Sequence, residues 1–84
     1  MHLPTICEAE LAKHYSKDDF WTSIDGLVYD VTRYAPIHPG GKQIFKGAGK
    51  EASQVFHAAH PGLQIANTPV SKCVIGRLCE RQED

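Results

Sequence analysis

Two β-rich segments joined by an Asp-Gly pair constrain the fold of this chain more than any other local feature. Residues 20–24 and residues 27–31 are rich in aromatic and β-branched side chains, which favour strands. Asp25-Gly26 between them is typical of a type I′ turn, in which both central residues adopt a positive φ. The sequence therefore predicts an antiparallel hairpin over residues 20–31.

The rest of the chain alternates short helical patterns with turn residues and ends on a strand pattern at Val74–Leu78. Short helical segments are expected over residues 7–14, 42–46, 50–60 and 63–66. Thr32 is expected to cap a turn that ends before Pro36. Strands with helices between them predict a single α+β domain over residues 1–84, in which the helices form a separate layer.

With 84 residues, the chain lies close to the lower size limit for a domain that is stabilised by its own core alone. Such chains are often helped by a metal, a cofactor or a disulfide. The net charge of -1 gives no general attraction for nucleic acid. No apolar segment approaches the ~20 residues that span a bilayer, and no signal peptide is evident. We therefore expect a soluble protein with no membrane span and no nucleic-acid partner.

Three cysteines, Cys7, Cys73 and Cys79, lack the C-x-x-C spacing of a structural zinc site. Their odd number argues against a complete disulfide framework. Two alternatives remain, either three unpaired thiols or one bridge with a third, buried thiol. A bridge would indicate an oxidising compartment, and unpaired thiols are expected in the cytoplasm.

The segment His38-Pro39-Gly40-Gly41 is the leading candidate for a functional site. Imidazole is the commonest side-chain metal ligand, and the two glycines allow the backbone to approach a bulky group closely. An ordinary turn is the alternative. His57 and His60 lie three residues apart in the predicted helix, so either could oppose His38. Zinc would need a third protein ligand, which the sequence does not indicate.

The sequence around these histidines is apolar. The neighbouring apolar residues are Ile37, Ile44, Phe45, Phe56, Leu63 and Ile65, and Ala52, Val55, Phe56 and Ala59 share one face of the predicted helix. An apolar slot reached by two imidazoles suits a flat hydrophobic metallocycle better than a bare ion. Gly47-Ala48-Gly49-Lys50 fails as a phosphate-binding loop, because Glu51 replaces the required Ser or Thr. No catalytic residue is predicted.

An ordered set of motifs resembles the haem-binding domain of the cytochrome b5 family. The set comprises Trp21, Val28-Tyr29-Asp30-Val31-Thr32, His38-Pro39-Gly40-Gly41, Ala48-Gly49, Phe56 with His60, and Val74-Ile75-Gly76-Arg77-Leu78. The resemblance runs in register from about Cys7 to Leu78. It implies a small mixed β-sheet with short helices that form a haem pocket. It also implies two hydrophobic cores, one packed around Trp21 and one holding haem b.

The resemblance implies His38 and His60 as the two axial ligands of the haem iron. The matching apolar positions of the haem pocket are Ile24, Val31, Tyr34, Ile44, Phe45 and Phe56. Leu63, Val70 and Val74 extend this wall into the segment after His60, where the chain is longer than the family pattern.

Ligation by two histidines leaves no open position on the iron, so the resemblance implies one-electron transfer and no enzymatic activity. We expect a monomeric electron carrier that exchanges electrons with redox partner proteins. The alternative is a haem domain of a larger redox enzyme, which relays electrons to an attached catalytic domain. A third alternative, binding of a ligand other than haem, is typical of relatives that lack both histidines.

Two further expectations depend on the family pattern. Family members carry glutamates after His-Pro-Gly-Gly, whereas here Lys42 and Gln43 follow, and residues 33–60 hold four basic residues (Arg33, Lys42, Lys46, Lys50) against one acid, Glu51. This charge predicts a partner with an acidic docking face, unless it is only a solvated surface. The family also places Cys79 beside the N-terminal segment, which predicts a Cys7–Cys79 bridge, and with it a secreted or extracytoplasmic protein, as the alternative to unpaired thiols.

Overall fold

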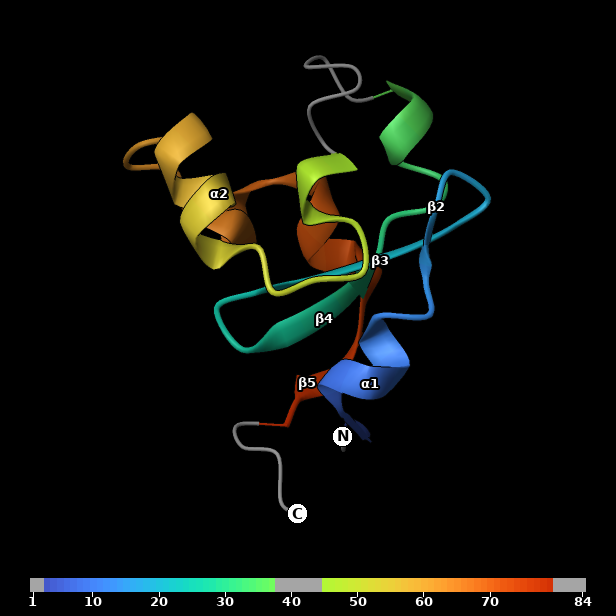
Figure 1. Cartoon of the computed structure of the whole chain (residues 1–84). Helices are drawn as coiled ribbons and strands as arrows, with labels where there is room; N and C mark the ends of the chain where they lie inside the picture. Colours follow the sequence, from blue (N-terminus) through green and yellow to red (C-terminus); the bar gives the residue numbers. More distant parts are fainter. Residues whose placement is uncertain (1–2, 38–44, 80–84) are drawn as a thin grey trace.

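The computed structural model describes residues 3–37 and 45–79, and its centre is a five-stranded sheet with the strand order β1-β5-β4-β3-β2 (Figure 1). The strands are β1 Thr5–Ile6, β2 Tyr15–Ser16, β3 Asp19–Ile24, β4 Leu27–Asp30 and β5 Val74–Leu78. β1 runs parallel to β5, whereas the other neighbouring strands are antiparallel. The predicted α+β class and the mixed sheet are therefore confirmed.

The predicted hairpin is confirmed as β3 and β4, which pair in register from Trp21 with Asp30 to Ile24 with Leu27. Asp25 has a φ of 53° and Gly26 a φ of 90°. Positive values at both positions are what a type I′ turn requires. The turn is therefore fixed by local chemistry, and it holds the two strands in one register.

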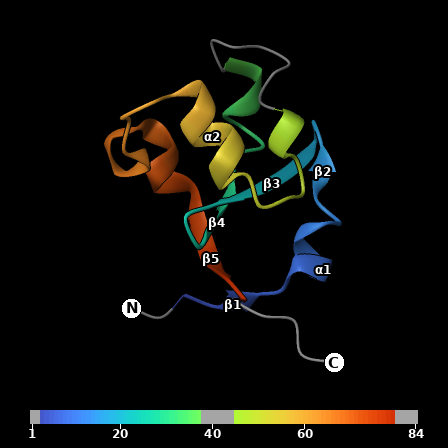
Figure 2. The ribbon, with the colours of Figure 1, turned by 60° about the vertical axis from the view of Figure 1, so that its left-hand side comes forward.

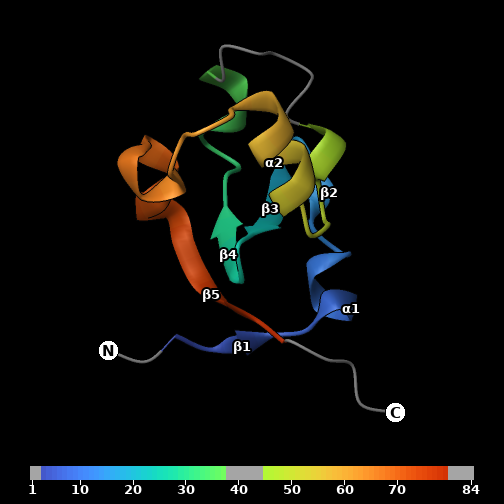
Figure 3. The same ribbon diagram turned by 90° about the vertical axis from the view of Figure 1, so that its left-hand side faces the viewer.

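Short helices lie at both ends of the sheet. They are α1 Glu8–Leu11, α2 Ser53–Ala59 and the 3-10 helices η1 Ala35–Ile37, η3 Ile65–Asn67 and η4 Pro69–Cys73. In Figures 1 and 3, α2 and η1 lie toward the top of the molecule, whereas α1 and β1 lie toward the bottom. Figure 2 shows α2 crossing above β3. The helices thus form two separate groups.

Some predicted element boundaries differ from the structure. α2 begins at Ser53 and not at residue 50, because the preceding residues pair with β3 instead. The Ser23 amide donates to the Lys50 carbonyl at 3.0 Å, and the Ala52 amide donates to the Ser23 carbonyl at 2.6 Å. Pro36 lies within η1 and does not end the turn, since an early helical position needs no amide donor.

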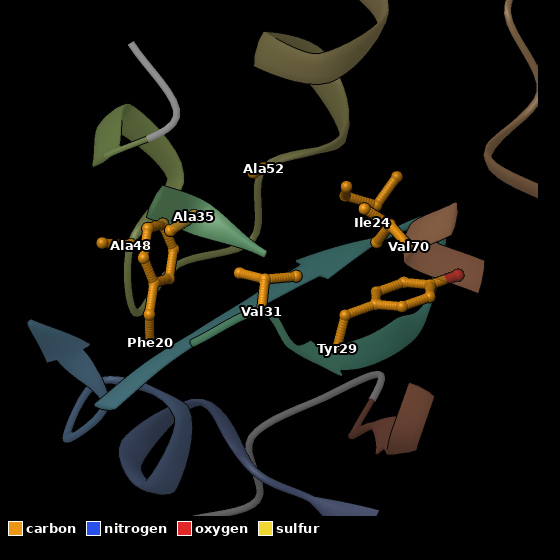
Figure 4. Close-up of a cluster of buried hydrophobic side chains, with 8 residues drawn as sticks. All are labelled: Phe20, Ile24, Tyr29, Val31, Ala35, Ala48, Ala52 and Val70. Atoms are coloured by element: carbon orange, nitrogen blue, oxygen red, sulfur yellow. The ribbon is translucent and has the colours of Figure 1, made fainter. Parts of the chain in front are cut away.

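Buried side chains from the sheet, the loops, η1 and η4 form a core on the α2 side of the sheet (Figure 4). Its buried members are Phe20, Ile24, Tyr29, Val31, Ala35, Ala48, Ala52 and Val70. In Figure 4, Phe20 lies beside Ala35 and Ala48, whereas Ile24 and Val70 lie near the Tyr29 ring. Strand alternation places Trp21 on the opposite face of β3, where it stacks on His14 with ring centroids 3.6 Å apart.

The three cysteines all belong to the described residues, and they form no disulfide. The end of β5 does lie beside the N-terminal segment, as predicted, because the Cys79 amide donates to the Ile6 carbonyl at 2.9 Å. The structure nevertheless lacks the Cys7–Cys79 bridge. Over residues 3–37 and 45–79, no helix is long and apolar enough to cross a membrane.

Candidate functional site

A cavity of about 690 Å³ lies between β3, α2 and the chain that follows α2. This volume falls within the ~300–1,000 Å³ of typical ligand and cofactor sites. The lining residues are Thr22, Ile24, Val31, Tyr34, Lys46, Gly47, Ala52, Val55, Phe56, Ala58, Ala59, His60, Leu63, Ile65, Thr68 and Val70. Most of them are apolar, so the cavity suits a large hydrophobic ligand.

Seven of the predicted site residues border this cavity: Ile24, Val31, Tyr34, Phe56, His60, Leu63 and Val70. His38 and Ile44 lie outside the described residues. Phe45 and Val74 are described by the structure but do not belong to the lining of this cavity. The Phe45 ring packs against Phe20, with centroids 4.9 Å apart, and Val74 begins β5 and packs against the buried core.

α2 contributes more residues to the cavity wall than the sequence analysis predicted. Val55, Ala58 and Ala59 border the cavity together with Phe56, and their helical spacing was the available signal. Thr22 could also have been found, because it precedes Ile24 by two residues in a strand and so shares its face. Lys46 and Gly47 belong to a single 3-10 turn, which is too short for periodicity to indicate which side chains point inward.

His60 lies at the end of α2, half-buried in the cavity wall. Its amide donates to the Phe56 carbonyl at 2.9 Å, and its ring lies 5.1 Å from the Phe56 ring, centroid to centroid. The chain then turns back at Gly62, whose φ is +79°. This left-handed conformation favours glycine, and it lets the chain after His60 return along the cavity.

His57 is directed elsewhere, although it is only three residues from His60. Its Nε2 atom lies 3.0 Å from each carboxylate oxygen of Asp25, in the β3–β4 turn. His57 does not belong to the cavity lining. The structure therefore separates the two histidines of α2, one at the cavity and one at the turn.

The polar groups of the lining are mostly satisfied by the backbone. The Thr22 hydroxyl donates to the Lys50 carbonyl at 3.3 Å, and the Thr68 hydroxyl donates to the Ile65 carbonyl at 2.8 Å. Lys46 is the only Lys, Arg, Asp or Glu among the described lining residues. Within residues 3–37 and 45–79, no group of three or more His, Cys, Asp or Glu residues is placed to hold a metal ion. The cavity thus suits a ligand that is apolar over most of its surface.

The backbone passes very close to β3 at Gly47. A Cβ atom there would lie 2.7 Å from the Ala52 Cβ and 3.1 Å from the Thr22 Oγ1. Any side chain at position 47 would therefore push the loop away from the cavity floor.

Comparison with known families matches residues 7–79 to the "Cytochrome b5-like Heme/Steroid binding domain". Among solved structures, the chain is similar to cytochrome b558 of Ectothiorhodospira vacuolata, a prokaryotic homologue of cytochrome b5. That pair has 32% identity and a TM-score of 0.80 and covers 90% of this chain and 99% of the other. The chain is also similar to the cytochrome b5 of Ostreococcus tauri virus 2, with 36% identity, a TM-score of 0.76 and coverage of 88% and 95%, respectively.

A much longer curated relative is the Delta(5) fatty acid desaturase A of Dictyostelium discoideum. It is 46% identical over 54 residues, which are 63% of this chain and 12% of that protein. The chain spans between 10% and 14% of the length of curated relatives such as this one.

Proposed function

This chain belongs to the cytochrome b5 family and is a haem b-binding electron-transfer domain, and we propose that His38 and His60 are the two axial ligands of its haem iron. The supporting observation is the apolar cavity with His60 in its wall and His57 turned toward Asp25. The assignment of His38 depends on its place in the His-Pro-Gly-Gly motif.

The described lining fits haem b. Its apolar residues match the macrocycle, and Lys46 borders the same cavity, where its ammonium would suit the carboxylate of a haem propionate. When bound, haem supplies one-electron exchange between the ferric and ferrous states. Ile24, Val31 and Phe56 would orient the cofactor and exclude water, which lowers the local dielectric constant.

The proposed ligation also decides the type of activity. Two protein nitrogens leave no position for substrate or oxygen on the iron, so we propose a carrier with no catalysis of its own. We further propose that it acts as a monomer, which sedimentation of the reconstituted protein would test.

Reconstitution with hemin tests the proposal directly. We expect a red protein with a sharp, low-spin Soret band that shifts on reduction with dithionite. A protein that stays colourless after the addition of hemin would contradict haem binding. A high-spin spectrum would contradict ligation by two histidines and leave haem binding intact.

The proposed redox partner has an acidic docking face. Arg33, Lys46 and Lys50 are exposed, and Lys46 borders the cavity, so positive charge lies close to the proposed haem site. Such charge raises association rates with an acidic partner, and the effect falls as salt rises. Lys42 belongs to the same basic group by sequence.

Two electron acceptors, one acidic and one basic, test this charge preference. Electron transfer should be faster to the acidic acceptor, and Lys42→Glu combined with Lys46→Glu should reduce or reverse the preference. Rates independent of salt, or faster transfer to the basic acceptor, would show that the lysines only form a solvated surface.

A second candidate function is that of a haem domain within a larger redox enzyme. The chain spans only a small part of the length of its curated relatives, and this favours the second candidate. An immunoblot of the native source would distinguish the two, because a chain of this sequence alone has a mass of 9.3 kDa. A much heavier band would support the larger enzyme, and a band near that mass would support the separate carrier.

A further inference from the structure

α2 borders the cavity and packs against the buried core through the partly buried side chain of Phe56. It has no buried residue, and Val55 is 43% exposed. An isolated helix of seven residues is not stable in water, so α2 must be held in place by other contacts. Hydrophobic burial supplies little of this, because one side of the helix faces the cavity.

The polar contacts that join α2 to the hairpin converge on Asp25, in the turn between β3 and β4. The Asp25 amide donates to the Ser53 hydroxyl at 2.7 Å, and the Asp25 carboxylate lies 3.0 Å from the His57 Nε2. Ser53 and His57 are four residues apart, so they lie on the same face of the helix. Phe56 and His60 have the same spacing, and both border the cavity.

Asp25 belongs to a turn that the sheet holds in place. Asp25 is the first central residue of the type I′ turn, and the neighbouring Ile24 is only 5% exposed. Such a turn places the backbone of Asp25 at a defined position relative to the sheet. It can therefore fix the position of a helix that is otherwise lightly packed.

We propose that Asp25, Ser53 and His57 form a latch that positions α2 against the hairpin turn, and that this latch controls how quickly haem leaves the cavity. His57 is then a positioning residue for His60, on which the proposed function depends. When the latch opens, α2 can move away from the cavity and carry His60 with it. The latch does not alter which atoms bind the iron.

Variants of the latch and of a matched pair elsewhere test this proposal. His57→Ala removes the imidazole, and Asp25→Asn removes the charge while keeping a residue type that tolerates positive φ. His57→Gln keeps a donor near the position of Nε2. The control is Asp19→Asn, because Asp19 forms a comparable pair with His14 Nδ1 at 2.8 Å but does not border the cavity.

The first measurement is the rate at which hemin passes to an excess of an apo-globin. Exposed ion pairs contribute modestly, so we expect release to be about two- to fivefold faster in His57→Ala and Asp25→Asn. His57→Gln should recover part of the loss, and Asp25→Asn should add nothing in the His57→Ala background. The Soret band should stay low-spin in every variant, and Asp19→Asn should release hemin at the wild-type rate.

The second measurement is amide hydrogen exchange of the full chain, with and without hemin. In His57→Ala, exchange over residues 53–59 should be faster, whereas exchange over residues 19–30 should not change. This measurement tests whether the latch holds α2 in place, even if the wild-type protein binds no hemin. In that case only the proposed function fails. Unchanged release and exchange, or equal acceleration in Asp19→Asn, would overturn the latch.

Discussion

The two α-helices among the described residues contribute to the fold in opposite ways. α1 has only four residues, yet its Leu11 is 1% exposed. α2 has seven residues, and none of them is buried. The difference lies in what each helix packs against, because α2 forms the wall of a cavity of about 690 Å³. One end of the molecule is packed by its own side chains, and the other leaves the space for a cofactor.

The comparison extends to two histidines that make similar polar contacts. His14 pairs with Glu10 and Asp19 and stacks on Trp21, so that its side chain is 18% exposed. His57 pairs with Asp25 and meets the Phe56 ring edge-on, and its side chain is 45% exposed. Similar chemistry therefore reinforces a packed region in one place and holds a lightly packed helix in the other.

The largest effect should come from replacing the two histidines at the C-terminal end of α2, one at a time. We expect His60→Ala to lose haem or to give a high-spin, five-coordinate spectrum, whereas His57→Ala keeps the low-spin spectrum. The absorption spectra after hemin addition check this. The opposite pattern would mean that α2 is rotated relative to the geometry described above.

The next largest effect should appear when a leucine is truncated in each region. Leu11→Ala removes a buried side chain, and it should lower the free energy of unfolding by ~3 kcal/mol. Leu63 is 38% exposed beside the cavity, so Leu63→Ala should lower it by less than ~1 kcal/mol in the protein without haem. Urea unfolding measures both, and similar losses would show that the two regions are packed equally well.

A smaller effect of opposite sign is expected at Ser23. Its side chain is fully buried, and its hydroxyl has no hydrogen-bond partner among the described residues. Ser23→Ala should therefore raise the free energy of unfolding by ~1 kcal/mol. Thr22→Val is the matched change on the cavity face, where the lost hydroxyl does have an acceptor, and it should not stabilise the protein. A loss of stability in Ser23→Ala would indicate that the hydroxyl is satisfied.

The smallest expected effect is a dependence of stability on pH through His14. Partial burial opposes its protonation, but hydrogen bonds to Glu10 and Asp19 outweigh this and raise the pKa of His14. Because the folded pKa is raised, the contribution is complete below the unfolded value of ~6.5 and is lost as pH rises through the folded pKa. Wild type should therefore melt above His14→Gln at pH 5, with a smaller difference at pH 9. A constant difference would show that only packing on Trp21 matters.

Much of this arrangement could be predicted because its signals are local. Asp25-Gly26 determines the hairpin, and the apolar spacing from Ala52 to Ala59 indicates which face of α2 borders the cavity. The strands β1 and β2 were not predicted, because two residues carry no detectable alternation. The early start predicted for α2 failed because residues 50–52 pair with Ser23, a contact distant in sequence. The contact between Asp25 and His57 spans 32 residues, and no sequence pattern signals it.

The parallel pairing of β1 with β5 makes the domain modular. Thr5 lies opposite Arg77 and Ile6 opposite Leu78, so the first and last strands lie side by side in the sheet. In Figures 1 and 3 this place is at the end of the molecule away from α2. A polypeptide fused through either strand would join the domain without covering the cavity. A larger protein joined to the domain in this way would leave the proposed haem site accessible to a partner.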